Sequence, residues 1–466
     1  MSSISRRSFL HQFTATTIAA AVTSGVRPTA RSVASAATAG DSLEVGVARR
    51  DPEPQLGQPM WGYIDPDQLS EGVRDPLYVR VVVLRVGDTA IGLAVLDMGR
   101  MPVPERCARL RERAKRFGID DVIFSATHTH SGPYMELPDL PHLDQVEEAI
   151  LEGLEEALNN AEPAKIGLGR GTIDIAHNRR LIKDGVCHMR WRNEERVATS
   201  PIDKEAAVIR LDSVASGKPL VSLVHYACHP VIFASDNKRY SADWPGEMCK
   251  LVREETGGEC VFLQGCAGDI NPYLDKTSLS DGADANVVGE GRTAGRAVLA
   301  ILKDIETSAP ASPAIAYRED PVVVGTRWDF SDPTQTRILE ENYGIMYEKY
   351  MKGLPADFAV PAGVLLINGD LALGFTPGEM FIEFQLDFKR RSAIKNAFLC
   401  GYGNEFHLYF PTVRDISYGG YGGATVTYVG VGAGEKLVTQ TTRLLGEMTG
   451  GIHALRGPED FEILEL

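Results

Sequence analysis

Histidines follow two strand-like segments of the chain, at the points where each segment ends. The apolar run 123–127 leads directly into the sequence HTHSGP at residues 128–133. Side chains at positions i and i+2 of a strand share one face, so this spacing predicts that His128 and His130 aim at one point. A second strand-like run ends in His229-Pro230, and His229 is a further candidate metal ligand. The histidines therefore indicate a metal-binding or catalytic site at strand ends.

Oxygen donors follow two more strand-like segments. Glu379 comes after a strand and a Thr-Pro-Gly turn, and Asp269 and Asn271 lie in the turn GDINP. Each of these has an ordinary interpretation as well, because carboxylates favour helix N-termini and Asp and Asn favour turns. Two neutral imidazoles and one carboxylate with an open position form the pattern of a catalytic zinc site, which lowers the pKa of bound water towards about 7. Because these residues lie far apart in the chain, spacing alone leaves their convergence open.

The elements that must position these residues alternate between strand-like and helix-like runs. Adjacent strands are predicted over 79–86 and 90–97, joined by Gly87-Asp88, and a strand over 121–127 precedes the first histidines. Further strands are predicted over 206–211, 220–226 and 259–263, helices over 105–117, 143–160, 245–255, 290–303, 336–352 and 434–448, and a hairpin over 364–374. With no internal repeat, the pattern predicts one large α/β domain over residues 40–466, a mixed β-sheet core flanked by helices, with a metal site at strand-end turns.

Composition and charge limit the kinds of molecule that we expect the protein to bind. The 466 residues are 44% hydrophobic and 24% charged, which is typical of a globular protein, and the formal charge of −15 opposes binding to nucleic acid. After the N-terminal segment there is no apolar run of about 18 residues, so we expect no transmembrane segment. The seven cysteines lack CxxC spacing, and we expect them to be buried thiols, as we expect His225 to be a packing residue. The oligomeric state is left open.

The N-terminal segment has the features of an export signal. Arg6-Arg7 stands directly before an apolar residue, and a weakly hydrophobic stretch rich in Ala and Thr follows. Small residues at 34–36 and 37–39 offer cleavage sites. Residues 1–39 therefore resemble a twin-arginine signal, a route that carries folded proteins, and we expect a periplasmic or secreted protein.

Several motifs, in this order along the chain, resemble the neutral/alkaline non-lysosomal ceramidases. They are SATHTHSGP (125–133), His229-Pro230, GDINP (268–272) and PGE (377–379), and the early segment 62–78 with GYIDP, GVR and LY also matches. The resemblance extends over most of the chain outside its two ends. It implies a zinc-dependent amidase that cleaves the N-acyl bond of a small-molecule or lipid-like substrate.

The resemblance also assigns roles to individual residues. It implies Zn²⁺ ligands at His128, His229, Glu379 and Tyr409, and catalytic-site positions at His130, Arg179, Tyr421, Asn271 and Asp269. Tyr421 follows Tyr409 by twelve residues, as the corresponding pair does in the family. His130 would orient or protonate the reacting group, whereas Arg179 and Tyr421 would contact the substrate carbonyl or the oxyanion formed from it.

Two departures from the family pattern bear on the function. Asn271 stands where the family carries a Ser; it cannot be a nucleophile, although its amide could donate a hydrogen bond to an oxyanion. The family also has a C-terminal β-sandwich domain, which we do not expect here after the helix predicted at 434–448. The alternatives are a zinc esterase or lactonase on the same scaffold, and a family member that binds a ligand without turnover, which Asn271 favours. A third is an amidohydrolase-type barrel, although that fold has its HxH on the first strand.

Overall fold

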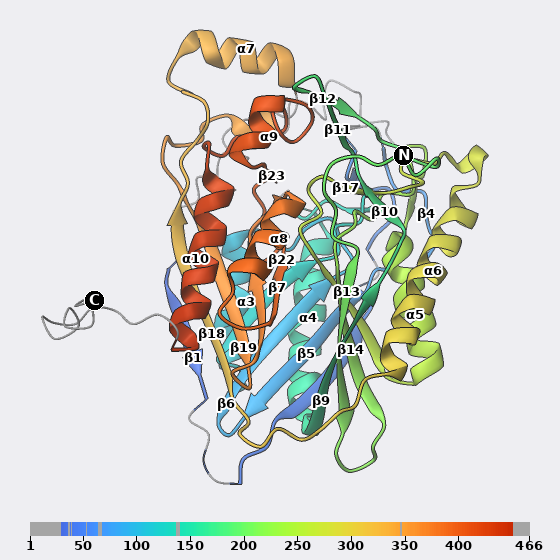
Figure 1. Cartoon of the computed structure of the whole chain (residues 1–466), viewed down its shortest axis with the longest axis vertical. Helices are drawn as coiled ribbons and strands as arrows, with labels where there is room; N and C mark the ends of the chain where they lie inside the picture. Colours follow the sequence, from blue (N-terminus) through green and yellow to red (C-terminus); the bar gives the residue numbers. More distant parts are fainter. Residues whose placement is uncertain are drawn as a thin grey trace, which may run out of the picture.

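Two β-sheets pack face to face at the centre of the molecule, and helices cover the outer face of each (Figure 1). The structure is a computed structural model, and it describes residues 29–35, 38, 40–52, 54–63, 68–136, 140–344 and 347–450. Residues 1–28, which carry the twin-arginine motif, lie outside the described residues.

The larger sheet has eight strands in the order β16-β14-β13-β9-β2-β5-β6-β7. Their bounds are β2 (Glu44–Arg50), β5 (Val79–Val86), β6 (Thr89–Leu96), β7 (Asp121–Ala126), β9 (Glu162–Thr172), β13 (Glu205–Ser213), β14 (Pro219–Tyr226) and β16 (Glu259–Gln264). The pairs β6–β7 and β14–β16 are parallel and the others antiparallel, which makes the sheet mixed.

The smaller sheet has five strands in the order β1-β18-β19-β20-β22. Their bounds are β1 (Arg31–Ala34), β18 (Ile315–Val323), β19 (Ala359–Ile367), β20 (Leu371–Phe375) and β22 (Asn396–Cys400). The β19–β20 hairpin turns at Asn368-Gly369, both with positive φ (52° and 77°), as an Asn-Gly hairpin turn requires. This confirms the hairpin predicted over 364–374.

The alternation of apolar side chains explains the layers. In β5, Val82 and Leu84 join the core between the two sheets, together with Leu365 and Leu373 of the smaller sheet. The intervening residue Val83 packs instead in the outer core with the helices. Successive side chains of a strand point to opposite faces, so strands that are apolar throughout are buried on both sides.

Helices cover the two outer faces. The larger sheet carries α3 (Pro104–Lys115), α4 (His142–Asn159), α5 (Asp243–Thr256) and α6 (Ala283–Lys303), and the smaller carries α8 (Ile382–Arg391) and α10 (Ala433–Met448). In Figure 1, α10 stands on one side of the sheets and α5 and α6 on the other. Among the described residues, none of the helices combines the length and apolarity that a bilayer span requires.

Short elements surround one end of the sheets. Five two-stranded pairs are β3 (Met60–Trp61) with β8 (Gly132–Pro133), β4 (Gly72–Val73) with β15 (Arg239–Tyr240), β10 (Ala176–Asn178) with β17 (Ile270–Pro272), β11 (Arg180–Lys183) with β12 (Val186–Met189), and β21 (Glu379–Met380) with β23 (Tyr409–Phe410). The remaining helical elements are η1 (Leu279–Asp281), α7 (Pro333–Tyr343), η2 (Tyr347–Met351) and α9 (Val413–Tyr418).

The predicted fold class is confirmed: a mixed α/β body has helices on its outer faces, and its β core consists of two sheets. Two packed sheets also contradict the amidohydrolase-type barrel. The helix predicted over 336–352 is wrong in its extent, because α7 ends before Gly344 and a short π-helix follows. All seven cysteines are free, and six of them are buried, as expected.

Candidate active site

The turns that follow β7 and β14 bring His128 and His229 together in the interior. Both side chains are buried, and their ring centroids lie 5.0 Å apart. The Nδ1 atom of His128 lies 2.8 Å from the Gly99 carbonyl, and that of His229 lies 3.1 Å from the Ile270 carbonyl. Because a carbonyl only accepts, each Nδ1 donates a hydrogen, and each Nε2 is left to face the interior of the site.

Glu379 lies between these two rings. Its Oε2 is 3.0 Å from His229 Nε2 and 3.5 Å from His128 Nε2. Burial by itself raises the pKa of Glu379, but the two imidazoles outweigh it and lower that pKa well below its ordinary value. Burial lowers the pKa of His229 to about 4. An ionised carboxylate beside the neutral imidazole of His229 is the protonation state that a divalent metal requires of these two groups.

The predicted fourth ligand is next to Glu379 in a short sheet. Tyr409 pairs with Glu379 in the parallel ladder of β21 and β23. Paired residues of neighbouring strands point to the same face, so the phenol and the carboxylate share one side of this ladder. Tyr409 is buried, and burial raises the pKa of its hydroxyl.

His130 lies at the same centre. Its Nε2 is 3.4 Å from His128 Nε2, and the ligand atoms of His128, His130 and His229 all lie within 4.8 Å of one another. Burial and the two neighbouring imidazoles lower the pKa of His130. Its Nδ1 is buried and has no hydrogen-bond partner within the described part of the chain. His130 is thus a neutral base at the edge of the cluster.

The convergence of His128 and His130 has a different cause from the predicted one. Strand β7 ends at Ala126, and His128 has φ of +71°, so the two residues lie in a turn and not on one face of a strand. The turn packs closely against Gly62, which has φ of +119°. Only glycine fits there, because a Cβ at position 62 would lie 2.5 Å from the Cβ of His130. The strand-alternation argument was therefore wrong, although the two imidazoles do converge.

Arg179 and two tyrosines form the neighbouring wall. Pairing of β10 with β17 brings Arg179 to the GDINP turn, where its Nη2 donates to the Gly268 carbonyl (2.6 Å). The guanidinium carbon lies 5.4 Å from the Tyr409 ring centroid and 5.1 Å from that of Tyr421. Tyr421 is half-buried, with its ring centroid 5.4 Å from that of Tyr409. The structure thus brings these three predicted residues together.

Asn271 faces Arg179 and a buried acid. Its Oδ1 accepts from Arg179 Nη1 (3.2 Å), and its Nδ2 donates to Asp275 Oδ2 (2.7 Å). The amide nitrogen, which we considered as an oxyanion donor, is therefore engaged by a carboxylate. This geometry makes Asn271 a residue that positions Arg179.

Asp269 holds the GDINP turn against two other elements. Its Oδ1 accepts from the backbone N–H of Ile382 at the start of α8 (2.8 Å), and its Oδ2 accepts from Asn178 Nδ2 (2.6 Å). Burial, assisted by the charge of Asp415, raises the pKa of Asp269 to about 7. Both carboxylate oxygens of Asp269 thus bind structural donors.

Sequence reasoning missed Gln264, a buried residue at the end of β16. Its Nε2 donates to the carbonyls of Thr127 (3.1 Å) and Cys228 (2.9 Å), and its Oε1 accepts from the Cys228 N–H (3.2 Å). One side chain thus ties together the turns that follow β7 and β14. A lone Gln at a strand end gives no sequence signal for this function.

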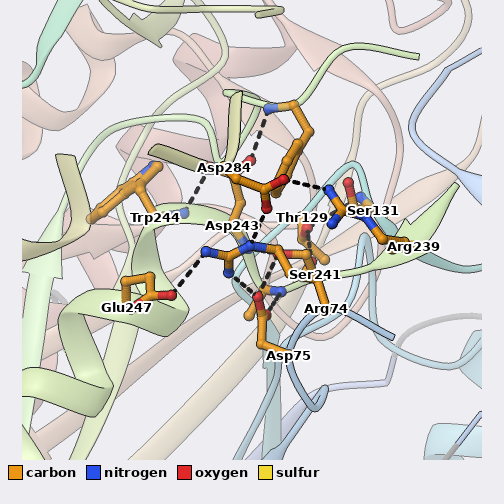
Figure 2. A network of polar contacts seen from close by, with 12 residues as sticks. Arg74, Asp75, Thr129, Ser131, Arg239, Ser241, Asp243, Trp244, Glu247 and Asp284 are labelled. Atoms are coloured by element: carbon orange, nitrogen blue, oxygen red, sulfur yellow. Dashed lines mark hydrogen bonds and ion pairs between the residues drawn. The ribbon is translucent and has the colours of Figure 1, made fainter. Parts of the chain in front are cut away.

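A polar network around the start of α5, drawn in Figure 2, contacts both histidine-bearing turns. Thr129 Oγ1 donates to the Ser241 carbonyl (2.6 Å), so the first turn is held by the segment that begins α5. Asp243 accepts from the N–H groups of Ile232 (3.0 Å) and Phe233 (3.2 Å), which follow His229.

Arg74 of the GVR motif completes this network. It binds Asp75, Glu247 and Asp284, and Asp75 in turn accepts from Ser241 Oγ (2.8 Å) (Figure 2). The early GVR motif therefore supports the site from outside it.

Comparison with known proteins identifies the family of the chain. The family model described as neutral/alkaline non-lysosomal ceramidase, N-terminal, matches residues 43–285, more than half of the chain. Neutral ceramidase A of Dictyostelium discoideum is 22% identical over an alignment of 252 residues, and the match covers 48% of this chain and 35% of that protein. The match therefore spans about a third of the length of this relative.

The fold is shared with solved ceramidase structures. A crystal structure of neutral ceramidase from Pseudomonas aeruginosa superposes with a TM-score of 0.70 at 16% identity, over 90% of this chain and 76% of that one. A structure titled as ceramidase complexed with C2 gives a TM-score of 0.69 at 16% identity, over 90% and 77%. By the match to its family model, the chain belongs to the neutral/alkaline non-lysosomal ceramidase family.

Proposed function

We propose that this protein is a zinc-dependent hydrolase that cleaves the amide bond of an N-acyl substrate. The observation that carries this proposal is the convergence of His128 and His229 on the ionised carboxylate of Glu379, each imidazole with its Nδ1 on a backbone carbonyl and its Nε2 towards the carboxylate. Family membership supports a hydrolase that acts on amide bonds.

These residues fit a divalent metal. His128, His229 and Glu379 would hold the ion, and Tyr409, paired with Glu379 in the β21–β23 ladder, would add a second oxygen donor. Each imidazole has its Nδ1 fixed by a backbone carbonyl, the outer-shell contact that orients histidine ligands in metal sites. When bound, zinc supplies a Lewis acid and lowers the pKa of coordinated water towards about 7.

The surrounding residues provide the remaining chemistry. Arg179 is buried and cationic, and with Tyr421 it would stabilise negative charge that develops on the carbonyl oxygen. His130 is neutral at neutral pH, because burial and its neighbours lower its pKa. It can therefore accept a proton from the attacking water and pass it to the leaving nitrogen.

Elemental analysis combined with turnover assays tests the proposal. We expect about one zinc per chain in the protein as purified, near-complete loss of zinc in His229→Ala, and retention in His188→Ala, which changes an exposed histidine outside the cluster. A chelator should abolish hydrolysis of an N-acyl amide, and added zinc should restore it. Full turnover after complete removal of metal would contradict the proposal.

The same assay separates the alternatives. A matched ester cleaved in preference to its amide would indicate an esterase or lactonase. A protein that holds zinc but turns over neither substrate would indicate a binding protein.

We also propose export by the twin-arginine route. Arg6-Arg7 before an apolar run supports it. The protein should appear in the periplasmic or extracellular fraction, and replacement of both arginines by lysine should retain it in the cytoplasm. Periplasmic accumulation of that double variant would count against this route.

A further inference from the structure

Lys276 lies beside the candidate active site, in a loop to which sequence analysis assigned no function. Its Nζ is 4.1 Å from the centroid of the Trp191 ring and 2.8 Å from Asp275 Oδ2. About a third of its side chain (35%) is exposed, whereas Asp275 is fully buried. The ammonium of Lys276 is therefore accessible to solvent, whereas the carboxylate of Asp275 is not.

Arg179 contacts the same indole ring. Its guanidinium carbon is 5.0 Å from the Trp191 ring centroid. The two terminal nitrogens donate to neutral acceptors, the Gly268 carbonyl and the Asn271 amide oxygen. Two cations thus contact one ring. Two acids act on them: Asp275, which also accepts a hydrogen bond from Asn271, and Glu379, whose charge acts on Arg179. Of the Lys276–Asp275 pair only the ammonium is exposed, so it is the charge of this pair that a ligand can reach.

Lys276 is on the His130 side of the site. Its backbone N–H donates to the Val231 carbonyl (2.9 Å), so its loop packs against the turn that carries His229. His130 packs against the same turn, because its backbone N–H donates to the neighbouring Pro230 carbonyl (3.4 Å). In the proposed reaction His130 supplies the proton to the leaving nitrogen. The ammonium is thus placed where the amine half of the substrate would lie.

We propose that the substrate carries a carboxylate on its amine half, as in an N-acyl α-amino acid, and that Lys276 binds this carboxylate. This rests on the proposed amidase function. A charge-assisted hydrogen bond to an ammonium is stronger than one between neutral groups, and the indole face keeps the cation in place. A neutral amino-alcohol head group has no charge to match the exposed ammonium of Lys276.

The reaction balances with water alone. The oxygen of water forms a bond to the acyl carbon, and the C–N bond breaks with its electron pair staying on nitrogen. The nitrogen takes a proton through His130, so the products are a carboxylic acid and a free amino acid.

A matched substrate pair tests the proposal with the zinc-loaded protein. N-lauroylglycine and N-lauroylethanolamine share the acyl chain and differ in a carboxylate against a hydroxymethyl group. We expect kcat/KM to be about tenfold or more higher for the glycine conjugate, and this ratio to fall about tenfold in Lys276→Gln. Lys276→Arg keeps the charge and should retain the ratio. Lys218→Gln, an exposed lysine in the β13–β14 hairpin, is the matched control and should leave the ratio as it is.

Calorimetry with the metal-free protein gives a readout independent of turnover. N-lauroylglycine should bind more tightly than N-lauroylethanolamine, and Lys276→Gln should remove the difference. If the wild-type protein hydrolyses and binds both compounds equally, the head-group proposal is overturned and the amidase function stands.

Two further outcomes separate the proposals. If neither compound is hydrolysed but binding of the glycine conjugate depends on Lys276, the amidase function fails while the carboxylate site is supported. If lauric acid binds as tightly as N-lauroylglycine with the same dependence on Lys276, the cation recognises the acyl product, and our assignment to the amine half is overturned.

Discussion

The carboxylate of Glu379 would determine the charge of the proposed metal centre. Its Oε2 lies 3.0 Å from His229 Nε2 and 3.5 Å from His128 Nε2. These two imidazoles hold the pKa of Glu379 well below its ordinary value, although burial alone would raise it. Glu379→Gln keeps the shape of the side chain but removes its charge. We expect zinc affinity to fall at least about tenfold, measured by competition with a chromogenic chelator. Glu383→Gln, in the first turn of α8, is the control and should bind zinc as the wild type does.

Asn271 has a separate and testable function. Because it accepts from Arg179 and donates to Asp275, Asn271→Ala should leave the guanidinium less constrained, and we expect kcat to fall about tenfold with little change in KM. Zinc content should stay at the wild-type level. An unchanged kcat would show that Arg179 needs no support from this side chain.

Asp269 makes stability depend on pH. Burial raises its pKa to about 7 in the folded protein, against an ordinary value of about 3.9 for an unfolded chain. Protonation of Asp269 therefore favours the folded state fully below about pH 4, and this contribution is lost as the pH rises through about 7. Asp269→Asn should reduce the difference in unfolding free energy between pH 5 and pH 8, measured by urea denaturation. The exposed Asp88→Asn should leave this difference unchanged.

At the scale of elements, β1 is part of the folded body. It pairs with β18 along its whole length, and Arg31 lies 2.5 Å from Asp121 and 2.6 Å from Glu319, both buried. Cleavage at 34–36 or 37–39, where small residues occur, would remove Arg31 and leave these acids with fewer partners. We therefore expect a chain that starts at residue 40 to unfold at a lower temperature than one that starts at residue 29. N-terminal sequencing of exported protein should find a start before Arg31.

Strand β9 shows why some elements were missed. Its sequence, EPAKIGLGRGT, contains glycines at alternate positions, and glycine disfavours strands. Here the lack of a side chain is used in packing: a Cβ on Gly169 would lie 2.6 Å from Ile305 and 2.7 Å from Ile301 of α6. By contrast, β5 and β6 are mostly apolar and rich in β-branched residues, and their pattern alone predicted them correctly. Strand β9 forms in spite of its glycines because of its tertiary packing, which a single sequence does not display.

Tertiary contacts, which a single sequence does not show, also limited the prediction of the candidate site. His128, His229 and Glu379 could be proposed from residue type at strand ends, and the family resemblance added Tyr409 and Arg179. Gln264, Trp191 and Lys276 could not be found, because their significance arises only when distant turns meet. The chemical type of each residue is known from the sequence, whereas its neighbours depend on how the two sheets pack.

At the scale of the whole molecule, metal and stability should be linked. The proposed ligands come from four separate segments, around residues 128, 229, 379 and 409, so an unfolded chain has no such site. Zinc at a hundred times its dissociation constant would add about 2.7 kcal/mol to the unfolding free energy. We expect a chelator to lower the melting temperature of the wild type and to have little effect on His229→Ala, measured by calorimetry. Equal shifts in both proteins would place the stabilising metal elsewhere.

The pairing of β1 with β18 has a further consequence for the order of folding. Arg31 and Glu319 are 288 positions apart, so β1 lacks its partner strand during synthesis until most of the chain has been made. Contacts of such long separation slow folding, and an unpaired strand edge promotes aggregation while it waits. A chain with this topology is better protected if it folds completely inside the cell before export. An export system that carries folded proteins would meet this requirement.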